Sequence, residues 1–214
     1  MSSQVKSKKR VAEHGEVFTN EREVNAMLDL VKQEAERIDS RFLEPACGNG
    51  NFLIEILKRK LKVVKSRYKK SQWEYEKNAL IAVMSCYGVD ILLDNVMECQ
   101  NRLFNYFETE YKAIFKKNTK QEYLDVVRFV LSKNILCGDA LSMKTNKNTP
   151  IVFAEWSFVR GMVQRRDFMY EQLITIEEKR NKQQTILGDF EDKPIKTYPL
   201  THYLNLKEDN KNAE

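Results

Sequence analysis

The positions of apolar and polar residues predict short strands that alternate with amphipathic helices along most of the chain. Apolar residues recur at helical spacing in segments that begin near Thr19 and cover 51–70, 72–86, 95–107, 123–131 and 168–181. Short apolar runs predict strands at 41–43, 88–91, 134–137 and 151–154. Strands that alternate with helices predict an α/β fold, in which a mostly parallel sheet is flanked by helices on both faces.

The two ends of the chain differ from this pattern. Residues 1–13 are polar and basic, and we expect a flexible basic N-terminus there. Residues 183–206 are expected to be mostly irregular with at most a short strand, and 207–214 to form a disordered tail. A length of 214 residues is typical of one domain. We therefore expect a single domain over 14–206.

Composition limits the surroundings and partners of the protein. Hydrophobic residues make up 42% of the chain, which is enough for a core, and no apolar run approaches the ~18 residues of a membrane span. A net charge of +5 permits contact with nucleic acid. The N-terminus has no apolar segment of the kind that directs secretion, so we expect a cytoplasmic protein without membrane contact.

The cysteines and histidines argue against a metal site. The cysteines lack the paired spacing that is typical of metal ligands, and the chain contains only two histidines. We therefore expect no metal. Reduced thiols are expected at Cys47, Cys86, Cys99 and Cys137.

The segment Phe-Leu-Glu-Pro-Ala-Cys-Gly-Asn-Gly-Asn-Phe-Leu at 42–53 predicts a strand, a tight turn and a helix. Gly48 and Gly50 remove side chains where a ligand could approach the backbone, and they allow positive φ angles. The helix that begins near Asn51 would direct its first amides and its positive dipole end toward the same place. The segment therefore predicts either a site for a small polar ligand or an ordinary turn between a strand and a helix.

This segment resembles the first motif of the S-adenosylmethionine-dependent, adenine-specific DNA methyltransferases of restriction-modification systems, Asp/Glu-Pro-Ala-Cys-Gly-x-Gly. Three further segments resemble motifs of this family in the family's order: His-Gly-Glu-Val-Phe-Thr at 14–19, Tyr-Gly-Val-Asp-Ile at 87–91 and Asn-Ile-Leu-Cys-Gly-Asp-Ala-Leu at 134–141. The resemblance implies a Rossmann-like methyltransferase fold, truncated relative to full-length members. It also implies transfer of a methyl group to adenine in DNA.

The same resemblance implies S-adenosylmethionine as the cofactor and assigns roles to the matching residues. The loop from Glu44 to Gly50 would hold the methionine end, Asp90 would accept the ribose hydroxyls, and Asp139 would accept from the adenine amine. The implied cofactor-binding residues are Phe18, Thr19, Glu44, Pro45, Ala46, Cys47, Gly48, Gly50, Asn51, Phe52, Asp90, Ile91, Asp139 and Ala140. The residue patterns also permit simpler roles, because an Asp after a strand can cap a helix or form a turn.

The family's catalytic motif has no match in this chain, so the catalytic residues are unknown. Family members carry Asp/Asn/Ser-Pro-Pro-Tyr/Phe after the fourth strand, where its polar atoms hold the target amine and its ring stacks on the flipped base. The corresponding segment, 152–158, reads Val-Phe-Ala-Glu-Trp-Ser-Phe. Glu155 could accept from an amine while Trp156 stacks on the base. Alternatively, Trp156 is a core residue and Glu155 forms an ion pair with Arg160, Arg165 or Arg166.

Two other segments have both a functional and a structural interpretation. The basic region 58–70 could contact phosphates or form a solvated helix face, and the nearby Trp73 and Tyr75 could stack on a base or pack between helices. The segment 158–168, which contains three arginines, could dock a partner or a phosphate backbone.

Three functions therefore remain open. The first is a short DNA adenine methyltransferase that acts on DNA alone or with a partner protein that supplies target recognition. The second is a catalytically inactive, cofactor-binding interaction protein of a restriction-modification or anti-restriction system. The third is a methyltransferase that acts on a small molecule or a protein through an atypical acceptor pocket.

Overall fold

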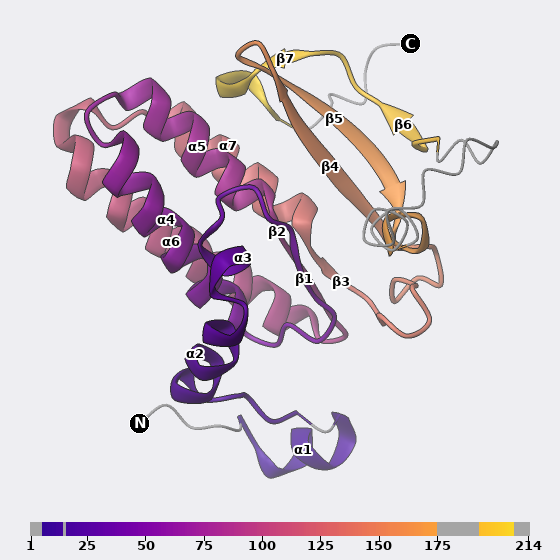
Figure 1. The fold of residues 1–214 in the computed structure, drawn as a ribbon. Helices are drawn as coiled ribbons and strands as arrows, with labels where there is room; N and C mark the ends of the chain where they lie inside the picture. Colours follow the sequence, from indigo (N-terminus) through magenta and orange to yellow (C-terminus); the bar gives the residue numbers. More distant parts are fainter. Residues whose placement is uncertain (1–5, 15, 175–192, 208–214) are drawn as a thin grey trace.

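Two β-sheets and four long helices lie side by side in the computed structural model, which describes residues 6–14, 16–174 and 193–207 (Figure 1). The first sheet is parallel and has the strand order β1 (Phe42–Glu44), β2 (Cys86–Asp90), β3 (Ile135–Cys137). The second is antiparallel and contains β4 (Val152–Val159), β5 (Met162–Met169), β6 (Lys196–Thr197) and β7 (Thr201–His202). The chain is therefore an α/β protein, as expected, but with mixed sheets.

Each connection between the parallel strands is a pair of helices. α4 (Asn51–Tyr68) and α5 (Gln72–Met84) join β1 to β2, while α6 (Leu93–Phe115), the short helix η1 (Lys116–Asn118) and α7 (Gln121–Asn134) join β2 to β3. Ser71 lies between α4 and α5, and its hydroxyl accepts a hydrogen bond from the Glu74 amide as the N-cap of α5. With 18 residues, α4 is about 27 Å long, so these helical pairs extend well past the strands.

The two faces of the parallel sheet are covered differently. Successive side chains of β2 point to opposite faces. A Cβ atom on Gly88 would lie 2.9 Å from the Leu53 side chain of α4, so this face packs on helices. On the other face, Tyr87 contacts Phe153 edge to face at 5.5 Å and donates a hydrogen bond from its hydroxyl to the Ala154 carbonyl at 3.0 Å. The expectation of helices on both faces is therefore wrong here, because an antiparallel hairpin covers the second face.

The strand expected at 151–154 is present at the start of β4, but it belongs to the antiparallel sheet and not to the parallel one. Parallel strands require a long crossover, usually a helix, whereas the segment after β3 folds back on itself through paired residues Asp139 and Lys144. β4 then runs from the carboxyl end of the parallel sheet to its amino end. Arg160 and Gly161, with φ angles of 51° and 85°, form the tight two-residue turn into β5.

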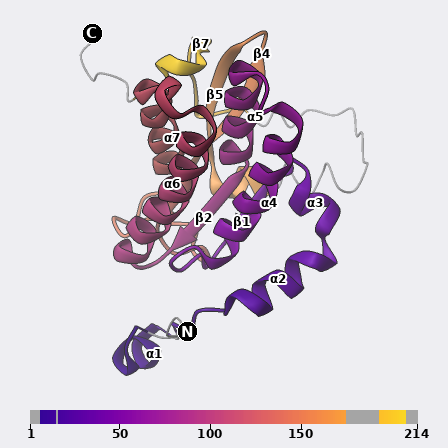
Figure 2. The same ribbon diagram turned by 90° about the vertical axis from the view of Figure 1, so that its left-hand side faces the viewer.

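The N-terminal part of the chain contains three helices, α1 (Lys8–His14), α2 (Glu21–Leu30) and α3 (Lys32–Glu36). Within the segment 1–13, which was expected to be flexible, the residues from Lys8 on form α1, which lies at the same end of the molecule as α2 (Figure 2). α2 begins near Thr19, as expected, and the Asn20 side chain caps it by accepting a hydrogen bond from the Glu23 amide. Residues 1–5 and 208–214 lie outside the described residues, and so do 175–181 of the helix expected over 168–181.

The remaining elements near the C-terminal end are short. The strand β5 takes up the first residues of the helix expected over 168–181, and the chain is helical from Tyr170 to Ile174. The region expected to be irregular contains β6, β7 and the short helix η2 (Tyr203–Asn205) in its described part. In the described ranges, no helix combines the length and the apolar character needed to cross a lipid bilayer.

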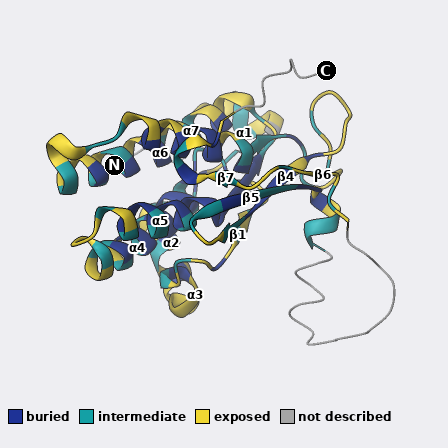
Figure 3. Cartoon of the chain, turned by 90° about the horizontal axis from the view of Figure 1, so that it is seen from above, coloured by how far each residue is buried: buried dark blue, intermediate teal, exposed yellow. Residues whose placement is uncertain are grey.

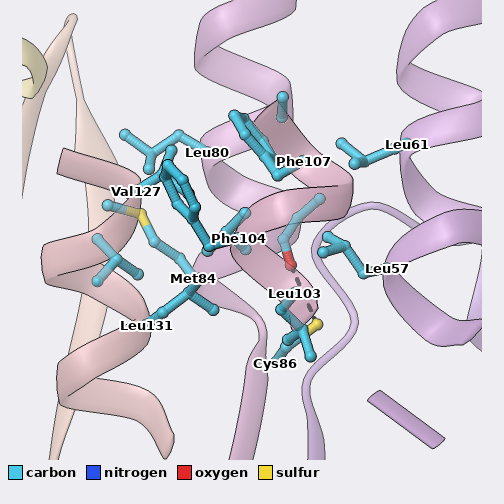
Figure 4. Packing of buried hydrophobic residues seen from close by; sticks show 14 of the residues in the cluster. Leu57, Leu61, Leu80, Met84, Cys86, Leu103, Phe104, Phe107, Val127 and Leu131 are labelled. Carbon is cyan, nitrogen blue, oxygen red and sulfur yellow. Dashed lines mark hydrogen bonds between the residues drawn. The ribbon is translucent and has the colours of Figure 1, made fainter. Parts of the chain in front are cut away.

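The main core lies between the helices and the helix-facing side of the parallel sheet. Buried positions face inward and exposed positions face outward on the helices (Figure 3). Side chains from all four long helices interdigitate there with Cys86 of β2 (Figure 4). They include Leu57, Leu61, Leu80, Met84, Leu103, Phe104, Phe107, Val127 and Leu131.

A buried carboxylate joins this core to the C-terminal segment. Glu76 of α5 is fully buried, and its oxygens accept from the hydroxyls of Tyr111 and Tyr203, at 2.6 and 2.7 Å, and from the Lys120 ammonium at 2.8 Å. Burial alone would raise the pKa of Glu76, but these hydrogen bonds lower it. The charged carboxylate therefore holds α5, α6, α7 and η2 together.

Replacing Glu76 by Gln should lower the free energy of unfolding by about 2–3 kcal/mol, because the charged acceptor of several donors is lost. Because the pKa of Glu76 is lowered in the folded state, its contribution is present above the ordinary glutamate pKa and is lost as the pH falls. Urea titrations of both proteins at several pH values measure this difference. Glu122→Gln, at an exposed position of α7, is the control. Equal changes in the free energy of unfolding for Glu76→Gln and Glu122→Gln would show that the Glu76 carboxylate does not hold these elements together.

Candidate functional site

A cavity of about 680 Å³ opens where the three parallel strands end. The N-terminal segment closes one side of it, and the loops after β1, β2 and β3 form the rest. All of the predicted cofactor-binding residues line this cavity except Gly50. The structure adds Glu16, Val17, Asn49, Leu92, Asn95, Gly138 and Leu141 to the lining.

The two glycines of the turn after β1 have different roles. Gly48 has a φ angle of 51°, and a Cβ atom there would lie 2.9 Å from the ring of Phe18, so this glycine lets Phe18 pack against the turn. Gly50 has a φ angle of 88°, and its Cβ would lie 2.5 Å from the Cys99 sulfur of α6. The expected role of Gly50 beside a ligand is therefore corrected, because this glycine serves the close packing of the turn on α6.

Asp90, at the end of β2, connects the loops around the cavity. Its Oδ2 accepts from the Gly48 amide at 2.9 Å, and its Oδ1 accepts from the Leu92 amide at 2.9 Å and from the Asn95 side chain at 3.2 Å. Asp90 is therefore not the N-cap of α6, which is Leu92; its carboxylate instead forms a turn before the helix and anchors the glycine turn. A carboxylate has about four acceptor positions, so one on Oδ2 is left for a ligand hydroxyl.

Glu44 presents a carboxylate to the cavity without a cationic partner among the described residues. Its one hydrogen bond in this part of the chain comes from the Ala46 amide, at 3.4 Å from Oε1. Burial raises the pKa of Glu44, and the Ala46 amide opposes this shift only in part. An ammonium group that entered the cavity would therefore find an uncompensated negative charge.

Asp139 lines the cavity from the loop after β3 and also shapes that loop. Its Oδ1 accepts from the Leu141 amide at 2.9 Å, which is the turn role that the sequence allowed. Hydrogen bonds from Ser142 and Leu141 lower the pKa of Asp139, so the exposed carboxylate is charged at neutral pH. Leu141, two residues after Asp139, projects into solvent at the cavity edge with 95% of its surface exposed.

A polar network fastens the N-terminal segment to the cavity. Arg10 of α1 donates two hydrogen bonds to the Glu16 carboxylate, both at 2.7 Å. The buried Asn95 donates to Glu16 Oε1 at 2.7 Å as well as to Asp90. Although burial opposes the shift, the bonds from Arg10 and Asn95 lower the pKa of Glu16. Sequence reasoning missed Arg10 and Asn95, since no motif contains them.

The segment at the place of the catalytic motif lies away from the cavity. Glu155 forms ion pairs with Arg41 and Arg166, each at 2.9 Å, near the amino end of β1. Trp156 is buried, and its indole N–H donates to the Asn134 side chain at 2.9 Å. The hypothesis that these two residues bind a target base is therefore wrong, and their structural interpretation is confirmed.

Two of the three arginines in 158–168 are occupied by intramolecular contacts. Arg165 makes two hydrogen bonds to the Asp167 carboxylate, at 2.8 and 2.9 Å, and lies over the Tyr198 ring. Arg166 is paired with Glu155. These contacts disfavour Arg165 and Arg166 as the residues that would dock a partner or a phosphate backbone. Arg160 is exposed in the turn and has no carboxylate partner among the described residues.

The cavity shows no arrangement suited to a metal. Across the described ranges, no cluster of three or more His, Cys, Asp or Glu side chains is placed to hold an ion, and all four cysteines are free thiols. Comparisons with protein-family models, curated proteins and solved structures found no match.

The surroundings of Gly50 and Gly161 predict that replacing each by Ala lowers the free energy of unfolding by different amounts. Gly161→Ala should cost about 1 kcal/mol of unfolding free energy, because its φ angle of 85° is unfavourable but no atom lies within 4 Å of the new methyl group. Gly50→Ala should cost about 1–3 kcal/mol more, because the methyl group also collides with Cys99. Chemical denaturation of both variants tests the difference, and equal costs would rule out a packing role for Gly50.

Proposed function

We propose that this chain binds S-adenosylmethionine and is a DNA methyltransferase-like protein with a truncated Rossmann-like fold. The proposal rests on one observation above all. The four segments that resemble methyltransferase motifs meet at a single cavity, and among its lining residues there is no Lys or Arg. Several carboxylates face it, namely those of Glu16, Glu44, Asp90 and Asp139.

The charge of the lining favours this cofactor over phosphate-bearing ones. Dinucleotides carry a pyrophosphate, which would lie close to uncompensated carboxylates in this cavity. S-adenosylmethionine carries a sulfonium and an ammonium group, and both are cations. The volume of about 680 Å³ is in the usual range for small-molecule sites.

Three parts of the cofactor have partners of suitable chemistry. The ammonium would pair with Glu44, and the ribose hydroxyl would donate to the free position on Asp90 Oδ2. Ile91 and Ala140, which are apolar and line the cavity, would border the adenine ring. A site at the carboxyl ends of parallel strands is also the usual ligand position in open α/β sheets.

For the activity itself, we propose methyl transfer to adenine in DNA in the cytoplasm, together with a partner protein that supplies target recognition. A specific observation favours the alternative of a cofactor-binding interaction protein without catalysis. Glu155 and Trp156 are held in ion pairs and hydrogen bonds away from the cavity, so the chain offers no acceptor group at the position of the family's motif.

Calorimetry with S-adenosylmethionine tests the cofactor. We expect one site, and Glu44→Gln should weaken binding about 10- to 100-fold, because a hydrogen-bonded charge pair contributes about 1.5–3 kcal/mol. Glu13→Gln is the control, because Glu13 lies on α1 and does not line the cavity. No measurable binding to the unsubstituted protein would refute the proposal.

The unsubstituted and Glu44→Gln proteins should also differ in how their affinity for S-adenosylmethionine depends on pH. Because the pKa of Glu44 is raised in the free protein and a bound ammonium favours the charged carboxylate, affinity should fall as the pH is lowered through that pKa. The Glu44→Gln protein should lack this loss of affinity. Identical pH profiles for the two proteins would show that Glu44 does not hold the ammonium.

Transfer of a labelled methyl group to DNA distinguishes the two candidate functions. We expect the purified chain alone to leave mixed-sequence DNA unlabelled, because the segment at the position of the family's catalytic motif is held away from the cavity. Label in DNA after addition of co-purifying proteins would support the partner-dependent enzyme. Label from the chain alone would show that an acceptor group exists elsewhere in it.

A further inference from the structure

The far ends of the two helical pairs meet and carry exposed lysines. The Gln72 side chain at the start of α5 donates to the Asn118 carbonyl at 2.8 Å, so the turn after α4 contacts the turn after α6. The first turn has Lys69 and Lys70 in sequence, and the second has Lys116 and Lys117. All four lysines are exposed, and their position at the end of the helices can be followed in Figure 1.

The structure divides the basic region predicted at 58–70 into a paired and an unpaired part. Before the end of α4, Arg59 pairs with Asp29 at 2.8 Å, Lys65 pairs with Glu110 at 2.9 Å, and Lys60 is fully buried. The exposed Lys62 has no carboxylate partner among the described residues. At the far end, the charges have no carboxylate partner within the described part of the chain. These unpaired residues are Arg67, Lys69, Lys70, Lys77, Lys116 and Lys117, which we call the basic tip.

An exposed tryptophan lies within this group. Trp73 is the second residue of α5, is 43% exposed, and has the Lys77 ammonium 5.1 Å from its ring centroid. Tyr75, the other aromatic residue considered for stacking, is fully buried and contacts Phe115 and Tyr111. The stacking hypothesis is therefore restricted to Trp73.

The basic tip is separate from the cavity in both place and charge. α4 begins at the cavity and ends beside Lys69, so the length of α4 places the tip about 27 Å away. The cavity lining carries carboxylates without Lys or Arg, whereas the tip carries unpaired cations. A polyanion is therefore attracted to the tip and repelled from the cavity.

We propose that the basic tip binds single-stranded nucleic acid, with its lysines on the phosphates and Trp73 stacked on a base. Lysines next to an exposed aromatic ring are the usual elements of such surfaces. A membrane surface is disfavoured, because Trp73 has no exposed apolar neighbour on the tip in the described structure with which to enter lipid. This inference does not depend on the proposed cofactor.

Fluorescence anisotropy with a labelled oligo-dT tests the proposal. Replacing Lys69, Lys70, Lys116 and Lys117 together by Gln should weaken binding at least about tenfold at low salt. It should also reduce the slope of log affinity against log salt by about 2–3, since each contacted phosphate contributes about 0.7 for single strands. The matched control replaces four other exposed lysines, Lys8, Lys9, Lys144 and Lys147. Equal losses in both proteins would overturn the proposal.

A second variant tests the stacked base. Trp73→Ala should weaken binding of oligo-dT severalfold but leave binding of heparin, a polyanion without bases, unchanged. Equal effects on both ligands, or tighter binding of wild-type protein to phosphatidylserine vesicles than to oligo-dT, would overturn the nucleic-acid assignment. Calorimetry with S-adenosylmethionine should give the same affinity for wild-type and tip variants, which keeps this test distinct from that of the cofactor.

Discussion

The carboxylate of Asp90 joins three parts of the chain that are far apart in sequence. It accepts from the Gly48 amide in the turn after β1 and from the Leu92 amide at the start of α6. Through Asn95 it is also connected to Glu16 and so to the N-terminal segment. Each of these segments lines the cavity. The walls of the cavity are therefore held at fixed distances by one acidic side chain, and the candidate site depends on it.

The glycine turn makes this arrangement possible. Gly50 brings the turn so close to α6 that no side chain fits between them, while Gly48 leaves room for the Phe18 ring. Arg102, also on α6, donates to the Asn49 carbonyl and the Asn51 side chain at 2.7 and 2.9 Å. The packing that shapes the cavity is thus continuous with the packing between α4 and α6.

Negative and positive charges lie at opposite ends of α4 and α6. Carboxylates gather where α4 and α6 begin, and unpaired lysines gather where they end. A net charge of +5 conceals this separation, because opposite charges at the two ends cancel in the sum. The overall charge thus suggested contact with nucleic acid in general, whereas the fold indicates which end of the molecule is suited to it.

The long helices, the three parallel strands and most of the cavity lining could be predicted from the sequence alone. Apolar periodicity and the residues that follow each strand are local properties, and the ends of parallel strands necessarily meet at one edge of their sheet. Only the tertiary structure decided the course of the chain after Asp139. There the chain folds back without a crossover helix, so β4 pairs antiparallel with β5 and does not join the parallel sheet. Glu155 and Trp156 on β4 therefore lie away from the cavity. It also decided the pairing of Arg10 with Glu16 and of Lys65 with Glu110, since the choice of partner for a charge depends on which helices pack together.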